Sequence, residues 1–109
     1  MVTAELAVAV PVIVVVLGLG LSAIRLGIDE VRCVDAARLA ARALARGDSE
    51  GSARALAVSA GPPGASVVVG ITGAEVSATV SASRDLAGWR MVTVRGSATA
   101  IQETMEEPP

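Results

Sequence analysis

The hydrophobic pattern of the chain is most distinctive at its N-terminal end. Residues 6–24 form an uncharged run of 19 residues, LAVAVPVIVVVLGLGLSAI, bounded by Glu5 and Arg25. As a helix this run would be roughly 28 Å long, close to the thickness of a bilayer hydrocarbon core, about 30 Å. Pro11 and the glycines would discourage a helix in water, but transmembrane helices tolerate both residue types. The run therefore predicts one transmembrane helix.

A cleaved secretory signal is the alternative explanation of the same run. No basic residues precede the run in the chain as given, and the run is longer than the usual apolar core of about 7–15 residues. At the candidate cleavage site after Ala23, Leu21 stands at the −3 position, where a small residue is expected. These observations favour an apolar helix that is not cleaved from the protein. The alternative is that the run is a cleaved signal and the rest of the chain is a secreted domain.

The helical pattern continues beyond the apolar run. Residues 25–46 are rich in Ala, Leu and Arg, which favour helix. Ile24 and Ile28 continue the apolar stripe at helical spacing. Gly47 is well suited to the position just after a helix end. We predict one helix over about residues 3–46, roughly 66 Å long, with one half in lipid and the other half projecting.

A short second helix is expected after a polar break at residues 48–51. It would run to about Ala60 and present a weak apolar face that includes Leu56 and Val58. The Gly-Pro-Pro-Gly sequence at residues 61–64 would end it.

Three strands are predicted in the remainder of the chain. Residues 65–71 are short and β-branched, and residues 75–83 alternate apolar with hydroxyl-bearing side chains. Residues 84–88 are predicted to form a loop, and residues 89–101 a third strand. Gly96 suggests a β-bulge in that strand.

The expected fold class is α+β, with a long N-terminal helix, a short second helix and a small three-stranded antiparallel sheet. The projecting half of the long helix would lay an Ala-rich face on the sheet. The predicted organisation has four parts. They are a transmembrane segment (1–24), a helical stalk (25–47), a small α+β domain (48–101) and an acidic flexible tail (102–109).

Composition narrows the range of functions. Hydrophobic residues make up 52% of the chain and aromatic residues 1%, with no His, no Lys and a net charge of −2. A negative net charge argues against direct nucleic-acid binding. The single Cys, with no His, leaves too few ligands for a Cys/His metal site. Without His or Lys, little is available to activate a nucleophile. We therefore expect no catalytic residues, no metal and no cofactor, and predict that the chain is not an enzyme.

The N-terminal residues resemble a known family. VTAELAVAVP at the start, and VRCVDAARLAARALARGD after the apolar run, are similar to TadE-like minor pilins of Tad (Flp-type) pilus systems. The resemblance covers about the first 48 residues and implies a pilin-like fold. In that family a prepilin peptidase cuts after a Gly, and the fifth mature residue is Glu, which matches Glu5. The Gly and the basic leader are absent here, so the chain corresponds to a processed pilin or to a start assigned too far downstream.

The orientation indicators disagree. Arg25 and Arg32 follow the apolar run and nothing basic precedes it, so positive-inside counting places the C-terminal side in the cytoplasm. The resemblance implies the opposite orientation. We follow the resemblance and expect a single-pass protein of the cytoplasmic membrane with its C-terminal domain outside, or on a pilus at the cell surface.

Glu5 and Pro11 are the candidate assembly residues. If helices pack in a filament, Glu5 leaves water, and a buried carboxylate is costly unless it is paired. The terminal ammonium at Met1 of a neighbouring subunit is the hypothesised partner, which would set the axial register. The alternative is that Glu5 is an ordinary interfacial acid, or an acid of the first helical turn favoured by the helix dipole. Pro11 is either a tolerated membrane proline or a point where the helix loosens on leaving lipid.

Cys33 and Trp89 are candidates for intermolecular contact. The simpler interpretation of Cys33 is a small, half-buried helical residue, and the alternative is an intermolecular disulfide in an oxidising exterior. Trp89 is expected to fill the small core, unless it is exposed and serves adhesion.

The expected function is that of a minor pilin, inserted in the membrane and then incorporated into, or priming, a Tad/Flp pilus. The resemblance implies four protein partners: a major pilin, other minor pilins, a prepilin peptidase and a platform membrane protein. The lipid bilayer is a further partner. The alternative is a single-pass anchor that never polymerises, whose outer domain binds another envelope protein.

Overall fold

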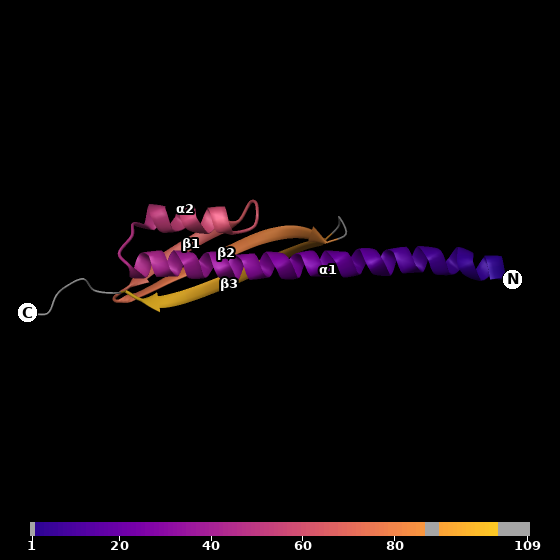
Figure 1. Ribbon diagram of the computed structural model, residues 1–109, viewed down its shortest axis with the longest axis horizontal. Coiled ribbons are helices and arrows are strands. Elements are labelled where there is room, and N and C mark those ends of the chain that lie inside the picture. The colour runs from indigo at the N-terminus through magenta and orange to yellow at the C-terminus, as the bar shows by residue number, and fades with distance from the viewer. Residues whose placement is uncertain (1, 87–89, 103–109) are drawn as a thin grey trace, which may run out of the picture.

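The computed structural model describes residues 2–86 and 90–102 of the 109-residue chain. The elements follow the order α1 (Val2–Ala45), α2 (Glu50–Ala60), β1 (Ser66–Thr72), β2 (Glu75–Leu86) and β3 (Arg90–Ile101). Both helices lie on one face of a single antiparallel sheet, and the N-terminal half of α1 extends well beyond the sheet (Figure 1). The chain is 86 Å long but only 20 Å and 19 Å across. The predicted α+β layout is confirmed.

Helix α1 is a single helix of 44 residues that continues through Pro11 without interruption. It ends at a C-terminal cap built around Gly47, which adopts a φ of 97°. The amide of Gly47 donates to the carbonyl of Leu44, and the amide of Asp48 donates to the carbonyl of Ala43, each at 3.0 Å. This pair of bonds is the Schellman arrangement, which satisfies carbonyls left free at a helix end and favours Gly at the left-handed position.

Helix α2 is held at its start by Ser49, whose Oγ accepts a hydrogen bond from the amide of Ser52 at 3.1 Å. The predicted apolar face is wrong, because Leu56 and Val58 are exposed and the buried residues are Ala53 and Ala57. These two alanines are four residues apart, on one side of the helix. Their small side chains let α2 lie close against α1 and β1.

The sheet has the order β1-β2-β3 with uninterrupted antiparallel pairing. Strand β2 is longer than predicted. Arg84 and Asp85, expected in a loop, pair with Val92 and Met91 of β3 and extend the ladder. These additional pairs form because β3 already begins at Arg90 and so provides strand partners for the end of β2. The sequence around residue 84 alone does not indicate these partners.

The core lies between α1 and the inner face of the sheet and consists mainly of alanine and valine. From α1 the buried residues are Cys33, Ala36, Ala37, Ala40, Ala41, Ala43, Leu44 and Ala45. From the sheet they include Val76, Ala78, Val80, Ala82 and Val94. The predicted Ala-rich helix face and the alternation along β2 are both confirmed.

Gly96 does not form the predicted bulge. It pairs regularly with Val80 in the continuous β2–β3 ladder. The need for glycine at this position comes from α1 instead. A Cβ at residue 96 would lie 2.3 Å from the backbone nitrogen of Val34 and 2.6 Å from the carbonyl carbon of Cys33. The helix backbone touches the strand backbone here, and only a residue without a side chain allows this approach.

Candidate functional site

The N-terminal half of α1 is the most unusual surface of the molecule. An 18-residue window of this helix has a mean hydropathy of 2.7, and none of it is buried by the rest of the chain. The exposed side chains include Leu6, Val8, Val10, Val12, Ile13, Val14, Val15, Val16, Leu17, Leu19 and Leu21. A soluble monomer rarely exposes an apolar patch of this extent. The helix is long enough and apolar enough to span a membrane.

Glu5 lies in the first turn of α1, next to this apolar surface, and its side chain is exposed. A carboxylate in the first turn interacts favourably with the positive end of the helix dipole. Its hypothesised partner, the ammonium of Met1, lies outside the described residues. The intersubunit pairing of Glu5 therefore stays a prediction.

Pro11 sits inside α1, where it has no amide hydrogen to donate to the carbonyl of Ala7. A shallow apolar groove of about 250 Å³ lies beside it, formed by Pro11, Val12, Val15 and Val16. The groove is open on the outer side of the helix, and its surface is almost entirely apolar. A lipid chain or an apolar side chain from another helix is the kind of group that it accepts.

Cys33 is fully buried, not half-buried, where α1 crosses the sheet. Burial raises the pKa of its thiol, and the nearby negative charge of Asp29 adds to the increase. A protonated, enclosed thiol is a poor nucleophile. An intermolecular disulfide at Cys33 would require the sheet to move away from the helix. The other candidate for intermolecular contact, Trp89, lies outside the described residues.

An ion pair that the sequence did not indicate joins the sheet to the middle of α1. Arg84 Nε donates to Asp29 Oδ2 at 3.0 Å, and its two other nitrogens donate to the backbone carbonyls of Pro63 (2.7 Å) and Ser83 (3.0 Å). The side chains are 29% and 15% exposed, so this pair is partly shielded from water. Helical spacing would also allow Asp29 to pair with Arg25 on its own helix, but the bonded partner of Asp29 is Arg84 of β2.

No family model, curated protein or solved structure matches this chain.

The chemistry available to the described residues is limited. Among residues 2–86 and 90–102, no group of three or more Cys, Asp or Glu side chains is placed to hold a metal ion. The features that remain are physical: an uncovered apolar helix, an acid at its start, and a domain fixed to its other half.

Proposed function

We propose that this chain is a TadE-like minor pilin that enters the cytoplasmic membrane and is then incorporated into, or primes, a Tad/Flp pilus. The observation that carries the proposal is the division of one continuous helix. Its first half is apolar and uncovered, and its second half is packed by alanines beneath a small sheet. This arrangement supports a subunit whose apolar helix passes from lipid into a bundle of similar helices.

Its mechanism would be physical and not catalytic. In lipid, the apolar half of α1 is solvated by acyl chains, and Glu5 remains at the interface. In a filament, helices replace lipid and Glu5 leaves water. The cost of burying this carboxylate is offset only by a cation at the same level. The terminal ammonium of an adjacent subunit has this charge, and pairing would fix how far one subunit is displaced along the filament.

The same assignment implies the partners. A prepilin peptidase would produce the mature N-terminus, a platform membrane protein would extract the subunit, and a major pilin with other minor pilins would pack around α1. The domain formed by α2 and the sheet would then lie outside the cytoplasmic membrane. On an assembled pilus it would present a surface for adhesion.

The test measures incorporation into pili for the wild type and for two variants, Glu5→Ala and Glu30→Ala. Each is expressed in the native host after its chromosomal copy of the gene has been deleted. Glu30 is an exposed acid on the same helix, beyond the apolar run, so it controls for loss of one negative charge. Leaving the partner ammonium unpaired costs about 3–5 kcal/mol. We therefore expect Glu5→Ala to lower the amount of subunit in sheared pili by about 100-fold or more, with Glu30→Ala unchanged.

Two results would contradict the proposal at different points. Normal incorporation of Glu5→Ala would remove the pairing mechanism but leave the pilin assignment intact. Absence of the wild type from sheared pili, with normal piliation in a strain lacking the gene, would favour the non-polymerising membrane anchor. That alternative accounts for the uncovered apolar helix equally well, because lipid alone can cover it.

A further inference from the structure

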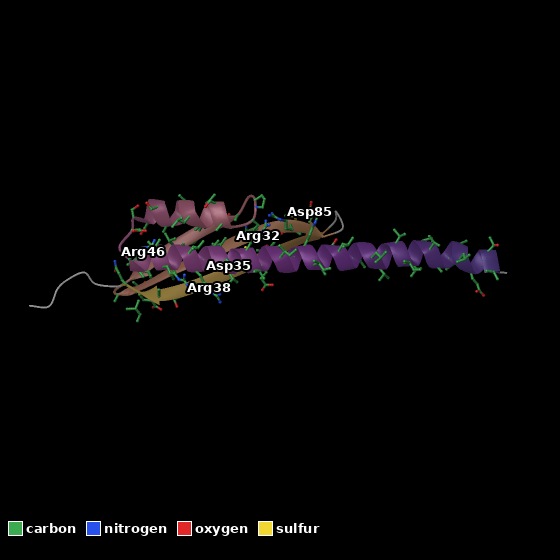
Figure 2. All side chains as sticks on the ribbon, viewed as in Figure 1. Arg32, Asp35, Arg38, Arg46 and Asp85 are labelled. Carbon is green, nitrogen blue, oxygen red and sulfur yellow. The ribbon has the colours of Figure 1, made fainter. Side chains whose placement is uncertain are left out.

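A groove of about 480 Å³, with charged side chains among apolar ones in its lining, lies where the apolar half of α1 meets the domain. One wall comes from α1 and the other from the segment before β1 and the end of β2. Its polar side chains include Ser22, Arg25, Arg32, Arg84 and Asp85. In Figure 2, Arg32 and Asp85 lie toward the end of the domain that faces the apolar helix, whereas Arg38 and Arg46 lie farther from it.

The position of the groove matches the polar layer of a membrane. Arg25 is the first charged residue after the apolar run, and Ser22 is one turn earlier. Each headgroup layer of a bilayer is roughly 5–8 Å thick, which is half of the difference between the whole membrane and its hydrocarbon core. Arg25 and Arg32 are seven residues apart, about 10 Å along the helix. With the end of the apolar run at the edge of the hydrocarbon core, Arg25 lies in the headgroup layer of the leaflet from which the domain emerges. The backbone of Arg32 then lies a few ångströms beyond this layer, and its long side chain can reach back to the phosphates, because side chains on a helix tilt toward its N-terminus.

The charge distribution of the groove favours an anion. Arg84 is neutralised by Asp29, at 3.0 Å. Within the described part of the chain, neither Arg25 nor Arg32 has an acidic partner within ion-pair distance. Seven residues are close to two helical turns, so these two arginines lie on the same side of α1. Asp85 is the other acid in the lining besides Asp29. Three arginines and two aspartates therefore give the groove a net charge of +1.

We propose that this groove binds the headgroup phosphate of an anionic phospholipid. Arg25 and Arg32 donate to the phosphate oxygens, the Ser22 hydroxyl lies at the glycerol side, and Asp85 opposes the negative charge from the facing wall. The bound lipid would hold the domain at a fixed height and rotation on the membrane. The inference requires the apolar helix to lie in a bilayer but does not require a pilus, and it holds for either orientation of the chain.

The experiment measures lipid binding by the full chain in detergent micelles, by native mass spectrometry during titration with phosphatidylglycerol or phosphatidylcholine. The test variant is Arg25→Gln with Arg32→Gln, and the matched control is Arg38→Gln with Arg42→Gln, which removes the same charge from the same helix outside the groove. The wild type should prefer phosphatidylglycerol. The test variant should lose about 10- to 30-fold in affinity for it, and the control should keep its affinity.

A second variant separates loss of binding from loss of folding. Asp85→Asn removes the opposing charge, so phosphatidylglycerol should bind several-fold more tightly than in the wild type, a gain that an unfolded protein cannot show. Equal binding of the two lipids by the wild type would overturn the proposal. So would equal loss in the two double variants, or a weakening by Asp85→Asn. Competition by phosphatidylethanolamine or inorganic phosphate at the same concentration as phosphatidylglycerol would also contradict it.

Discussion

Small side chains determine how closely the helix and the sheet approach each other. Alanines fill most of the buried face of α1, and Gly96 lies directly against the backbone of Val34. A core of this kind buries little apolar area per residue, so close packing has to provide much of its cohesion. Single added methyl groups are therefore expected to have large effects at some positions and small effects at others.

Replacing Gly96 by Ala should destabilise the domain by about 1–3 kcal/mol or more, because the new Cβ would overlap backbone atoms that have no rotamer to change. Gly70→Ala is the control, since its Cβ would meet only the movable Oγ of Ser77, at 3.2 Å. Thermal unfolding followed by circular dichroism in detergent measures both. Equal stability of the two variants would show that α1 and β3 are not in backbone contact.

Cys33 provides a second prediction, based on pH. Because the chain has no Tyr, Lys or His, its thiol is the only side chain that titrates between about pH 8.5 and 11. Burial raises the pKa of Cys33 in the folded protein. The contribution of the protonated thiol is therefore complete below the unfolded pKa of about 8.5, and is lost as pH rises through the folded pKa. Stability should fall over this range in the wild type and stay level in Cys33→Ala. A matching fall in Cys33→Ala would exclude the thiol as its cause.

At the scale of elements, the Asp29–Arg84 ion pair joins the sheet to α1 near the apolar half of the helix. Arg84 also bonds to the carbonyl of Pro63, so one guanidinium connects α1, the α2–β1 segment and β2. The opposite end of the domain is held by the cap at Gly47 and by the packing of α2. Among the described residues, this ion pair is thus the side-chain hydrogen bond between the domain and the part of α1 that leads into the apolar run.

A double-mutant cycle on Asp29→Asn and Arg84→Gln should give a coupling free energy of about 1 kcal/mol, above the value for most fully exposed pairs. Unfolding by urea in detergent provides the four stabilities. The Arg46–Asp48 pair, 58% and 39% exposed, serves as the comparison and should show weaker coupling. A coupling near zero at Asp29–Arg84 would mean that the domain is held by packing alone.

The elements that could be predicted from sequence are those with local patterns. The apolar run, the Ala-rich stalk ending at Gly47, and the alternation along β2 each carry their own periodicity or cap. Contacts between distant residues could not be predicted in this way. Arg84 and Asp29 are 55 positions apart, and the role of Gly96 depends on where α1 crosses β3. The buried face of α2 was missed for the same reason, because Ala53 and Ala57 are selected by close packing and not by hydrophobicity.

At the scale of the whole molecule, the chain is a rod 86 Å long with a domain along one half. The domain packs on α1 from about Leu26 to Ala45, whereas the apolar window before it is not covered by any other part of the chain (Figure 1). The hydrophobic effect requires that lipid, detergent or other helices cover this surface. The proposals on the pilus and on the lipid groove both depend on this unequal division.

The central claim is that the apolar half of α1 remains part of the mature protein and lies in a membrane. Alkaline carbonate extraction of native cell membranes, followed by intact mass measurement of the detergent-purified chain, tests it most directly. We predict that the protein stays with the membrane pellet and that its mass includes residues 6–24. Recovery of a detergent-free soluble form whose mass begins after Ile24 would contradict this account.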